Sequence, residues 1–201
     1  MFSISPLLTG VRNPYQGIMT YQQGYGQRIW LPVWSFLVQN DQHNVLIDTG
    51  LDENELFVPP QFTEDTGLEA DTLVNLLAAK GLVPDDIDIV VNTHLHDDHC
   101  GNNALFTQAQ HYTHPLEISF CKDPHPLDHR YDDYFIEDIH FNEIEEGEIV
   151  PGLKVFHSPG HTLGTLSVEI ETKLGPAIIL VFVVIRKIFQ QMALLYARVF
   201  T

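Results

Sequence analysis

The chain has 201 residues, which is enough for one domain with a full core and too few for two comfortable domains. Its 44% hydrophobic and 18% charged residues are typical of a folded globular protein, which excludes disorder of the whole chain. The formal net charge of -17 disfavours a nucleic-acid ligand, because binding to polyanions depends on basic patches.

The first quarter of the chain predicts an antiparallel opening. Four segments between Gly, Pro and Asn residues are rich in β-favouring side chains: residues 2–8, 17–21, 28–39 and 44–47. Trp30 and Trp34 fall on the same face of one predicted strand. Two uses of this face are open, packing in the core and stacking on a substrate, and the sequence favours packing.

The next segment predicts a loop, then a helix, then a buried strand. Residues 52–67 are polar and contain prolines, which predicts an irregular loop. Residues 71–80 carry apolar side chains at helical spacing and end in a lysine before Gly81, so we expect an amphipathic helix against one sheet face. Residues 87–91 are apolar except for Asp88 and predict a short buried strand that runs out into a polar loop.

This loop holds the strongest chemical signal of the chain. Four side chains that commonly bind metals occur within six residues: His94, His96, Asp98 and His99. In extended backbone His94 and His96 point to the same side, so both can reach one ion, and the two ligands after the bend can face a second. Imidazole and carboxylate suit zinc, iron or manganese. The alternative, a polar loop with solvated histidines, is disfavoured because four ligands share one short array.

Cys100 follows this array, and the only other cysteine is Cys121. Two cysteines form no disulfide framework and fit a reducing cytoplasm. A ligand role for Cys100 is open because His99 is adjacent, but a small buried residue is the favoured interpretation. Residues 1–6 lack the basic and apolar regions of a secretory signal, so we expect a cytoplasmic location.

Residues 101–142 predict short elements followed by a polar and aromatic segment. We expect a short helix or turn at 101–108 and a strand at 109–112. No two histidines between residues 113 and 142 share a compact ligand spacing, which favours a helical insertion with solvated histidines near the site entrance. The alternative is a lid whose aromatic side chains contact the substrate. The residues concerned are His114, His125, His129, His140, Tyr131, Tyr134 and Phe135.

The C-terminal part predicts strands and then a change of pattern. Strands are expected at residues 143–148, 153–157, 165–171 and 177–181. His157 is expected to pack within its strand, whereas His161 lies on the turn that follows. The segment from 177 onward has three of the ten basic residues and no acidic one. A membrane span there is disfavoured, because nine apolar residues precede the first charge whereas roughly 20 are needed.

The array His94-x-His96-x-Asp98-His99 resembles the signature of the metallo-β-lactamase superfamily of metallo-hydrolases. The segment from Ser158 to Gly164, with Pro-Gly-His at its centre, is similar to the second metal-binding turn of that family. Residues 45–50 resemble the strand and turn that precede the site, so the resemblance spans roughly residues 30–176. Within the superfamily, the array and the Pro-Gly-His turn are most similar to the N-acyl-homoserine lactonase group.

The resemblance implies an α+β fold, an αβ/βα sandwich of two mixed β-sheets with helices on the outer faces. It also implies hydrolysis of a lactone or ester by a metal-bound hydroxide. The implied ligands are His94, His96 and His161 for a first zinc ion, and Asp98 and His99 for a second. Asp98 would in addition be the catalytic residue that orients the water and passes its proton to the leaving alkoxide. Asp48 would support the site through hydrogen bonds.

The sequence departs from the family pattern in its last part. The family has a later Asp that bridges both ions and a final His, and the lactonases have a Tyr near that Asp. Here no Asp follows Asp138 and no His follows His161. We therefore expect a hydrolase domain at 1–181 that is incomplete at its C-terminus, a divergent tail at 182–201, and one tightly and one weakly bound zinc ion.

Two rival functions follow from these observations. One is another hydrolase on the same fold, such as a thioesterase or phosphodiesterase, because fold alone does not separate these activities. The other is a catalytically impaired, metal-binding remnant. The expected partner is a small lactone or ester, with no nucleic acid and no membrane, and the sequence leaves the oligomeric state open.

Overall fold

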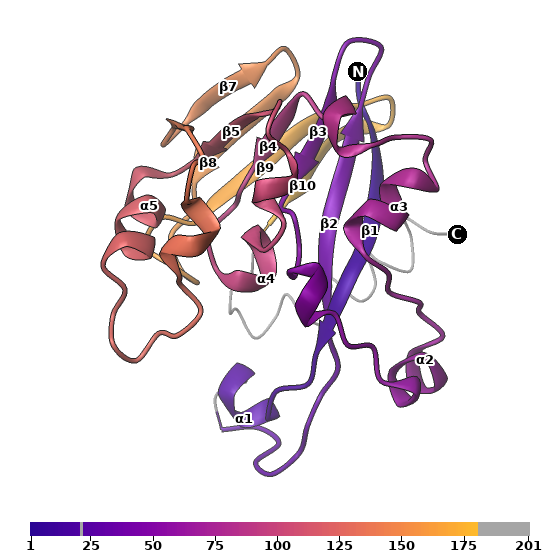
Figure 1. Cartoon of the computed structure of the whole chain (residues 1–201), viewed down its shortest axis with the longest axis vertical. Coiled ribbons are helices and arrows are strands. Elements are labelled where there is room, and N and C mark those ends of the chain that lie inside the picture. Colours follow the sequence, from indigo (N-terminus) through magenta and orange to yellow (C-terminus); the bar gives the residue numbers. More distant parts are fainter. Residues whose placement is uncertain (21, 181–201) are drawn as a thin grey trace.

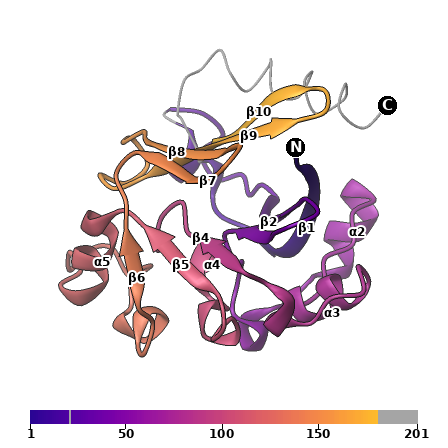
Figure 2. The ribbon, with the colours of Figure 1, turned by 90° about the horizontal axis from the view of Figure 1, so that it is seen from above.

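Two β-sheets packed face to face form the body of the protein (Figures 1 and 2). The computed structural model describes residues 1–20 and 22–180. One sheet is mixed, with six strands in the order β1-β2-β3-β4-β5-β6, and the other has four strands in the order β10-β9-β8-β7. The predicted α+β sandwich is confirmed with one correction. The second sheet is antiparallel in its described strands rather than mixed, because β7 to β10 follow one another through short turns.

The chain opens with antiparallel strands, as predicted, and continues the same sheet with parallel ones. The strands are β1 (Ser3–Arg12), β2 (Leu31–Gln39), β3 (Asn44–Ile47), β4 (Ile89–Val91), β5 (Gln110–Thr113), β6 (Phe141–Glu143), β7 (Gly147–Val150), β8 (Leu153–His157), β9 (Leu166–Thr172) and β10 (Gly175–Ile179). The α-helices are α1 (Gln16–Met19), α2 (Pro60–Thr66), α3 (Leu73–Ala78), α4 (Asp97–Cys100) and α5 (Pro115–Lys122). Short 3-10 helices lie at Glu53–Glu55, Pro84–Asp86, Asn103–Leu105 and Asp133–Ile136.

The alternation of side chains along β3 explains how one sheet packs on both faces. Val45 and Ile47 are buried in the core between the sheets, together with Val168 of β9. Leu46 points the other way and packs with Leu77 of α3, which lies outside the six-stranded sheet in Figure 2. Since successive side chains of a strand face opposite sides, a short and uniformly apolar strand serves both layers. This packing holds the ends of the central strands in fixed positions.

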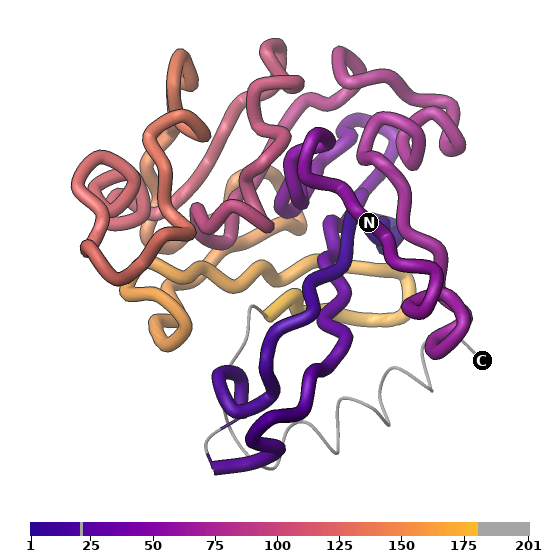
Figure 3. The backbone as a smooth tube through the Cα atoms, turned by 60° about the horizontal axis from the view of Figure 1, so that its bottom comes forward, coloured from indigo at the N-terminus to yellow at the C-terminus, as the bar shows by residue number. Residues whose placement is uncertain are grey.

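The connection between β1 and β2 differs from the prediction. Residues 17–20 lie in α1 and its C-cap rather than in a strand, and Figure 3 shows this connection extending beyond the sheet. The regular ladder between β1 and β2 ends at the pair Arg12 and Leu31, and beyond it the described residues keep an isolated bridge between Tyr15 and Arg28. Local propensity therefore does not decide the structure of this segment.

The segment predicted as a loop at residues 52–67 contains helix α2. Pro60 occupies the first turn, where a missing N–H is tolerated, and Phe62 anchors the helix by complete burial. The ring of Trp30 meets that of Phe62 edge-on at a centroid distance of 5.8 Å. Trp34 packs against the same cluster, so both tryptophans serve the core, as predicted.

Residues 181–201 lie outside the described residues, as does residue 21. The divergent tail at 182–201 and the domain boundary at 181 therefore stay predictions. In the ranges 1–20 and 22–180, no helix combines the length and the apolar character needed to cross a membrane.

Gly101 directly follows α4, and the chain packs too closely there for a side chain. A Cβ at this position would lie 2.3 Å from the backbone nitrogen of Asp52 and 2.8 Å from the carbonyl oxygen of Gly50. We expect Gly101→Ala to lower the free energy of unfolding by about 1–3 kcal/mol, measured by urea denaturation, because neither backbone atom can move alone. Gly160→Ala is the matched control, since in the described structure a Cβ there has no neighbour within 4 Å. Equal stability of the two variants would contradict this close packing.

Candidate metal centre

Three strands of the large sheet deliver polar residues to one edge. Strands β3, β4 and β5 are parallel neighbours, so their carboxyl ends lie side by side. The residues after these ends are Asp48, the polar loop from Asn92, and His114. Asp48 adopts a φ of 59°, a left-handed conformation that Asp tolerates better than most residues. The sheet thus collects the predicted ligand array and its predicted supporting residue at one place.

The second sheet contributes His161 from the turn between β8 and β9. The backbone N–H of Leu166, the first residue of β9, donates to the carbonyl of Thr93 at 2.8 Å. This bond joins the start of β9 to the end of β4 across the two sheets. The site is therefore assembled from loops that are far apart in sequence and belong to different sheets.

His94, His96 and His161 converge as the sequence predicted. One ring nitrogen from each lies within 4.8 Å of the others. The ring centroids are 4.5 to 4.9 Å apart and the ring planes are nearly perpendicular, which brings nitrogen atoms from three directions. Nδ1 of His96 lies 3.1 Å from Nε2 of His161. This is the donor arrangement of a catalytic-type zinc site, in which three protein ligands leave a position for water or substrate.

The hydrogen-bonding state of this trio fits a bound cation. Among the described residues, Nε2 of His94 and Nε2 of His96 are buried and have no hydrogen-bond partner. A buried polar atom without a partner costs about 1–3 kcal/mol. A divalent ion would give such nitrogens a partner and remove this cost. The residues present therefore fit the metal that the motif predicts.

The electrostatic environment keeps the three histidines neutral. Burial is the main cause, and it lowers the pKa of His94 well below its ordinary value, that of His96 to about 3 and that of His161 to about 4. The positive charge of Arg130 adds to the effect at His96 and His161. A neutral imidazole has a free lone pair, so these side chains are ready to bind metal at neutral pH.

These shifts predict that metal affinity changes little between about pH 7 and pH 5, because His96 and His161 already lack the competing proton. A histidine with a raised pKa stabilises the fold at low pH, whereas these histidines with lowered pKa values destabilise it there. The unfolded chain takes up protons below a pKa of 6.5 and the folded chain does not, so the metal-free protein should lose stability as the pH falls from 6.5 towards 4. Calorimetric titration with zinc and urea denaturation check the two parts. A tenfold loss of affinity per pH unit starting near pH 6.5 would show that the histidines titrate as exposed groups.

Asp98 and His99 lie beside the trio, as predicted, and share a second charged cluster. Nδ1 of His99 lies 2.8 Å from Oδ2 of Asp48, and its ring centroid is 4.0 Å from that of His94. Although burial opposes it, the Asp48 carboxylate raises the pKa of His99 to about 9. Oδ1 of Asp98 lies 3.9 Å from Nε2 of His99. Burial raises the pKa of Asp98, but His99 and Arg12 outweigh it and lower that pKa, so Asp98 is an ionised carboxylate at neutral pH.

Asp48 has the supporting position that the resemblance implies. Its carboxylate accepts hydrogen bonds from the backbone N–H and the hydroxyl of Thr93, the residue before His94. It also pairs with His99, so one buried carboxylate fixes both halves of the ligand array. Such partners orient metal ligands without touching the ion.

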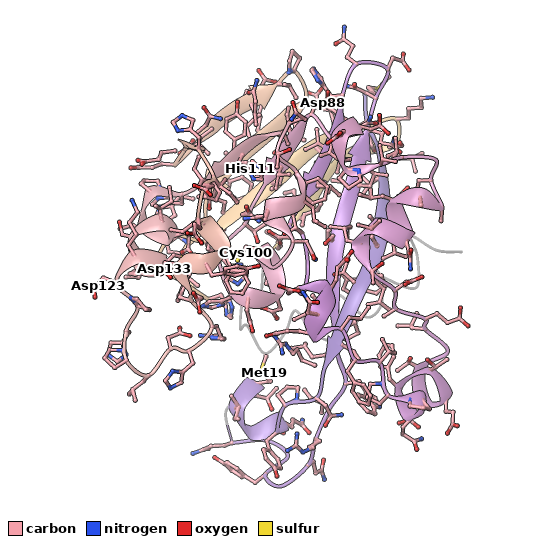
Figure 4. The ribbon with its side chains drawn as sticks, in the orientation of Figure 1. Met19, Asp88, Cys100, His111, Asp123 and Asp133 are labelled. Carbon is pink, nitrogen blue, oxygen red and sulfur yellow. The ribbon has the colours of Figure 1, made fainter. Side chains whose placement is uncertain are left out.

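Cys100 is a small buried residue, as the sequence favoured. Its thiol donates to the carbonyl of His96 at 3.2 Å, and burial raises its pKa well above the ordinary value. Figure 4 shows Cys100 on the ribbon of α4 near the centre of the molecule, whereas Asp123 lies at the periphery. His157 is exposed at the end of β8, and its ring stacks on that of His114 at a centroid distance of 4.3 Å.

The segment from 113 to 142 is more involved in the site than predicted. Three of its histidines are exposed, as expected for solvated side chains, namely His125, His129 and His140, but His114 is buried because it caps α5 and packs on His157. Tyr131 is also buried, and its ring packs against that of His96 at a centroid distance of 4.5 Å. Oδ2 of Asp128 lies 3.6 Å from Nε2 of His96. No spacing pattern in the sequence indicates these contacts.

A cavity of about 180 Å³ opens next to His161. Its lining combines aromatic and aliphatic side chains with a few polar groups: Phe120, His125, Asp128, Tyr131, His161, Thr162 and Leu163. Cavities with mostly apolar walls and few polar groups are typical of small-molecule sites.

A two-sheet sandwich with a histidine trio at the strand ends defines a class of metal-binding sandwich proteins. The chain belongs to the metallo-β-lactamase superfamily, since the model of this family matches residues 28–179.

Known relatives and structures agree with this assignment. The chain is 35% identical over 168 residues to the N-acyl homoserine lactonase AiiA of Bacillus thuringiensis subsp. kurstaki, covering 77% of this chain and 64% of that relative. A crystal structure of a B. thuringiensis AiiA variant with N-decanoyl-L-homoserine bound at the active site superimposes with a TM-score of 0.72 at 27% identity, covering 87% of this chain and 73% of that one. The chain also superimposes on an N-acyl homoserine lactone hydrolase that has N-hexanoyl-L-homoserine bound at the catalytic metal centre. The TM-score is again 0.72 at 27% identity, covering 87% of this chain and 73% of that one. The chain thus spans slightly less than two thirds of the length of the curated lactonase.

Proposed function

We propose that this protein is a metal-dependent hydrolase that opens lactone or ester rings, with N-acyl-homoserine lactones as the preferred class. The observation that carries the proposal is the convergence of His94, His96 and His161 beside an apolar cavity. The relatives support the substrate class, because they are N-acyl homoserine lactonases and one related structure holds a ring-opened product at a catalytic metal centre.

The proposed metal is zinc, with one ion held tightly by the three histidines and a second held weakly by Asp98 and His99. Three imidazole ligands are typical of catalytic zinc, whereas two residues alone leave an ion under-coordinated. When bound, a divalent metal supplies Lewis acidity that polarises a carbonyl and makes water nucleophilic near neutral pH.

Asp98 is the proposed proton carrier of the reaction. Its lowered pKa keeps it ionised, so it can accept a proton from the attacking water at neutral pH. The protonated carboxyl can then return this proton to the alkoxide that leaves as the ring opens. His99 lies close enough to hold the carboxylate in place.

The cavity walls are proposed to hold the apolar part of the substrate. Phe120, Tyr131 and Leu163 offer apolar surface next to His161. The net charge of -17 disfavours long-range attraction of anionic substrates, which supports an uncharged lactone over a phosphodiester. The two free, buried cysteines support a reducing cytoplasm as the location.

A substrate panel at equal zinc loading tests the proposal. An acyl-homoserine lactone, a thioester and a chromogenic phosphodiester are compared for the wild-type chain, its metal-free form and His161→Ala. We expect the wild-type chain to hydrolyse the lactone fastest. The metal-free form and His161→Ala should be inactive on all three substrates. Faster phosphodiester or thioester cleavage, abolished in His161→Ala, would assign a different hydrolase activity to the same centre.

The second candidate is a metal-binding protein with impaired catalysis, and one sequence observation favours it. Residues 182–184, where the family's bridging Asp would be expected after the strand at 177–181, are Phe, Val and Val. Stoichiometric zinc binding without turnover of any substrate in the panel would support this candidate.

A further inference from the structure

Glu117 is a completely buried carboxylate in α5 that accepts four hydrogen bonds. Oε2 accepts from the backbone N–H of Leu95 at 3.0 Å and from the hydroxyl of Tyr131 at 2.9 Å. Oε1 accepts from the hydroxyl of Thr162 at 2.6 Å and from the backbone N–H of Gly164 at 3.0 Å. Each carboxylate oxygen thus accepts from one backbone N–H, a group that can only donate, and from one hydroxyl.

The four donors belong to the segments that carry the metal ligands. Leu95 lies between His94 and His96, and the ring of Tyr131 packs on that of His96. Thr162 and Gly164 lie on the turn that carries His161. A single side chain outside the ligand set therefore touches both ligand-bearing loops and the ring beside one ligand.

The fit around Glu117 is close. A Cβ on Gly164 would lie 2.5 Å from Oε1 of Glu117, so this position requires glycine for the approach of the carboxylate. The turn also has its own bonds, from the N–H of Ser158 to the carbonyl of Thr165 and from the N–H of Gly160 to the carbonyl of Thr162. These bonds hold the shape of the turn, and the N–H of Leu166 ties the start of β9 to the carbonyl of Thr93 at the end of β4. Glu117 adds a further link at Thr162 and Gly164, which lie next to His161 in the sequence.

We propose that Glu117 is a positioning residue that sets the affinity and geometry of the metal centre by joining the loop of His94 and His96 to the turn of His161. The inference rests on the metal site of the proposed function but not on any substrate. Without this link, the ligand-bearing turn keeps its internal bonds and the bond between Leu166 and Thr93, but the residues next to His161 lose their tie to the loop of His94 and His96. Residues that orient metal ligands in this way typically change metal affinity by about 10–100-fold when replaced.

Glu117→Gln tests the proposal at nearly constant volume. Whichever way the amide turns, its NH₂ group faces a backbone N–H, so at least one donor loses its acceptor. We expect the folded variant to bind Zn²⁺ about 10–100-fold more weakly in competition with a chromophoric chelator. The visible spectrum of the Co²⁺-loaded variant should differ from that of the wild type, because the histidines no longer hold the same geometry. Glu148→Gln is the matched control, since Glu148 also accepts a backbone N–H, that of Gly152 at 2.9 Å, but does so on β7.

A smaller change keeps the proposal testable if Glu117→Gln does not fold. Thr162→Val removes one donor to the carboxylate at similar shape, whereas Thr162→Ser keeps the hydroxyl. We expect weaker Zn²⁺ binding in Thr162→Val and wild-type binding in Thr162→Ser.

The metal readouts separate the possible outcomes. A purely structural role would lower the unfolding midpoint of metal-free Glu117→Gln while leaving the Zn²⁺ affinity and Co²⁺ spectrum of the folded fraction unchanged, and that result would overturn the proposal. If the wild type hydrolyses no lactone but the affinities differ as expected, the proposed function fails and the role of Glu117 stands.

Discussion

His96→Ala is expected to release the tightly bound zinc ion and to lower kcat/KM for a lactone by about 10³-fold or more, because two imidazoles cannot hold a catalytic ion in place. We expect the loss of zinc and of turnover to be large because His96 is buried. Nε2 of His96 is buried without a hydrogen-bond partner among the described residues, and Oδ2 of Asp128 lies 3.6 Å from it. Elemental analysis after dialysis, together with steady-state kinetics, measures both effects. The variant should also gain no thermal stability from added zinc, since metal binding couples to folding.

His43→Ala is the matched control for this experiment. His43 lies just before β3, at the end of the strand opposite to Asp48. It should keep one tightly bound ion and wild-type turnover. Two tightly held ions in the wild type, or an ion retained by His96→Ala, would show that further ligands exist, and His111, His114 and His129 would then be replaced in turn.

The sequence predicts the sandwich well where a strand is buried on two faces or alternates. Residues 89–91 and 45–47 are short apolar runs, and both lie in central strands whose side chains serve two cores. It fails at 17–20 and within 52–67, since residues 17–20 lie in α1 and its C-cap and the second segment contains a helix anchored by the burial of Phe62. These differences depend on tertiary contacts, which local propensity does not contain.

The candidate site also has a part that could be predicted from the sequence and a part that could not. The histidine array and the Pro-Gly-His turn are local patterns, so their convergence could be predicted from spacing and resemblance. The contacts of Glu117 and Tyr131 join segments separated by tens of residues, and a single Glu on a helix of average composition carries no signal of its own. Burial alone distinguishes Glu117 from the solvated acids of this strongly acidic chain.

Asp98→Asn is expected to lower kcat for lactone opening by about 10²–10⁴-fold while the first zinc ion stays bound, because an amide cannot accept the proton of the attacking water. The three residues that are proposed to hold this ion are histidines and do not include Asp98. The neighbouring variant Asp97→Asn is the control. The Asp97 carboxylate pairs with Arg12 at 2.5 Å, so its loss should cost stability more than turnover. Zinc content, kcat and the urea midpoint of each variant are measured together. If Asp98→Asn keeps kcat close to that of the wild type at equal zinc loading, Asp98 is not the proton carrier, and its role is limited to the weak second site.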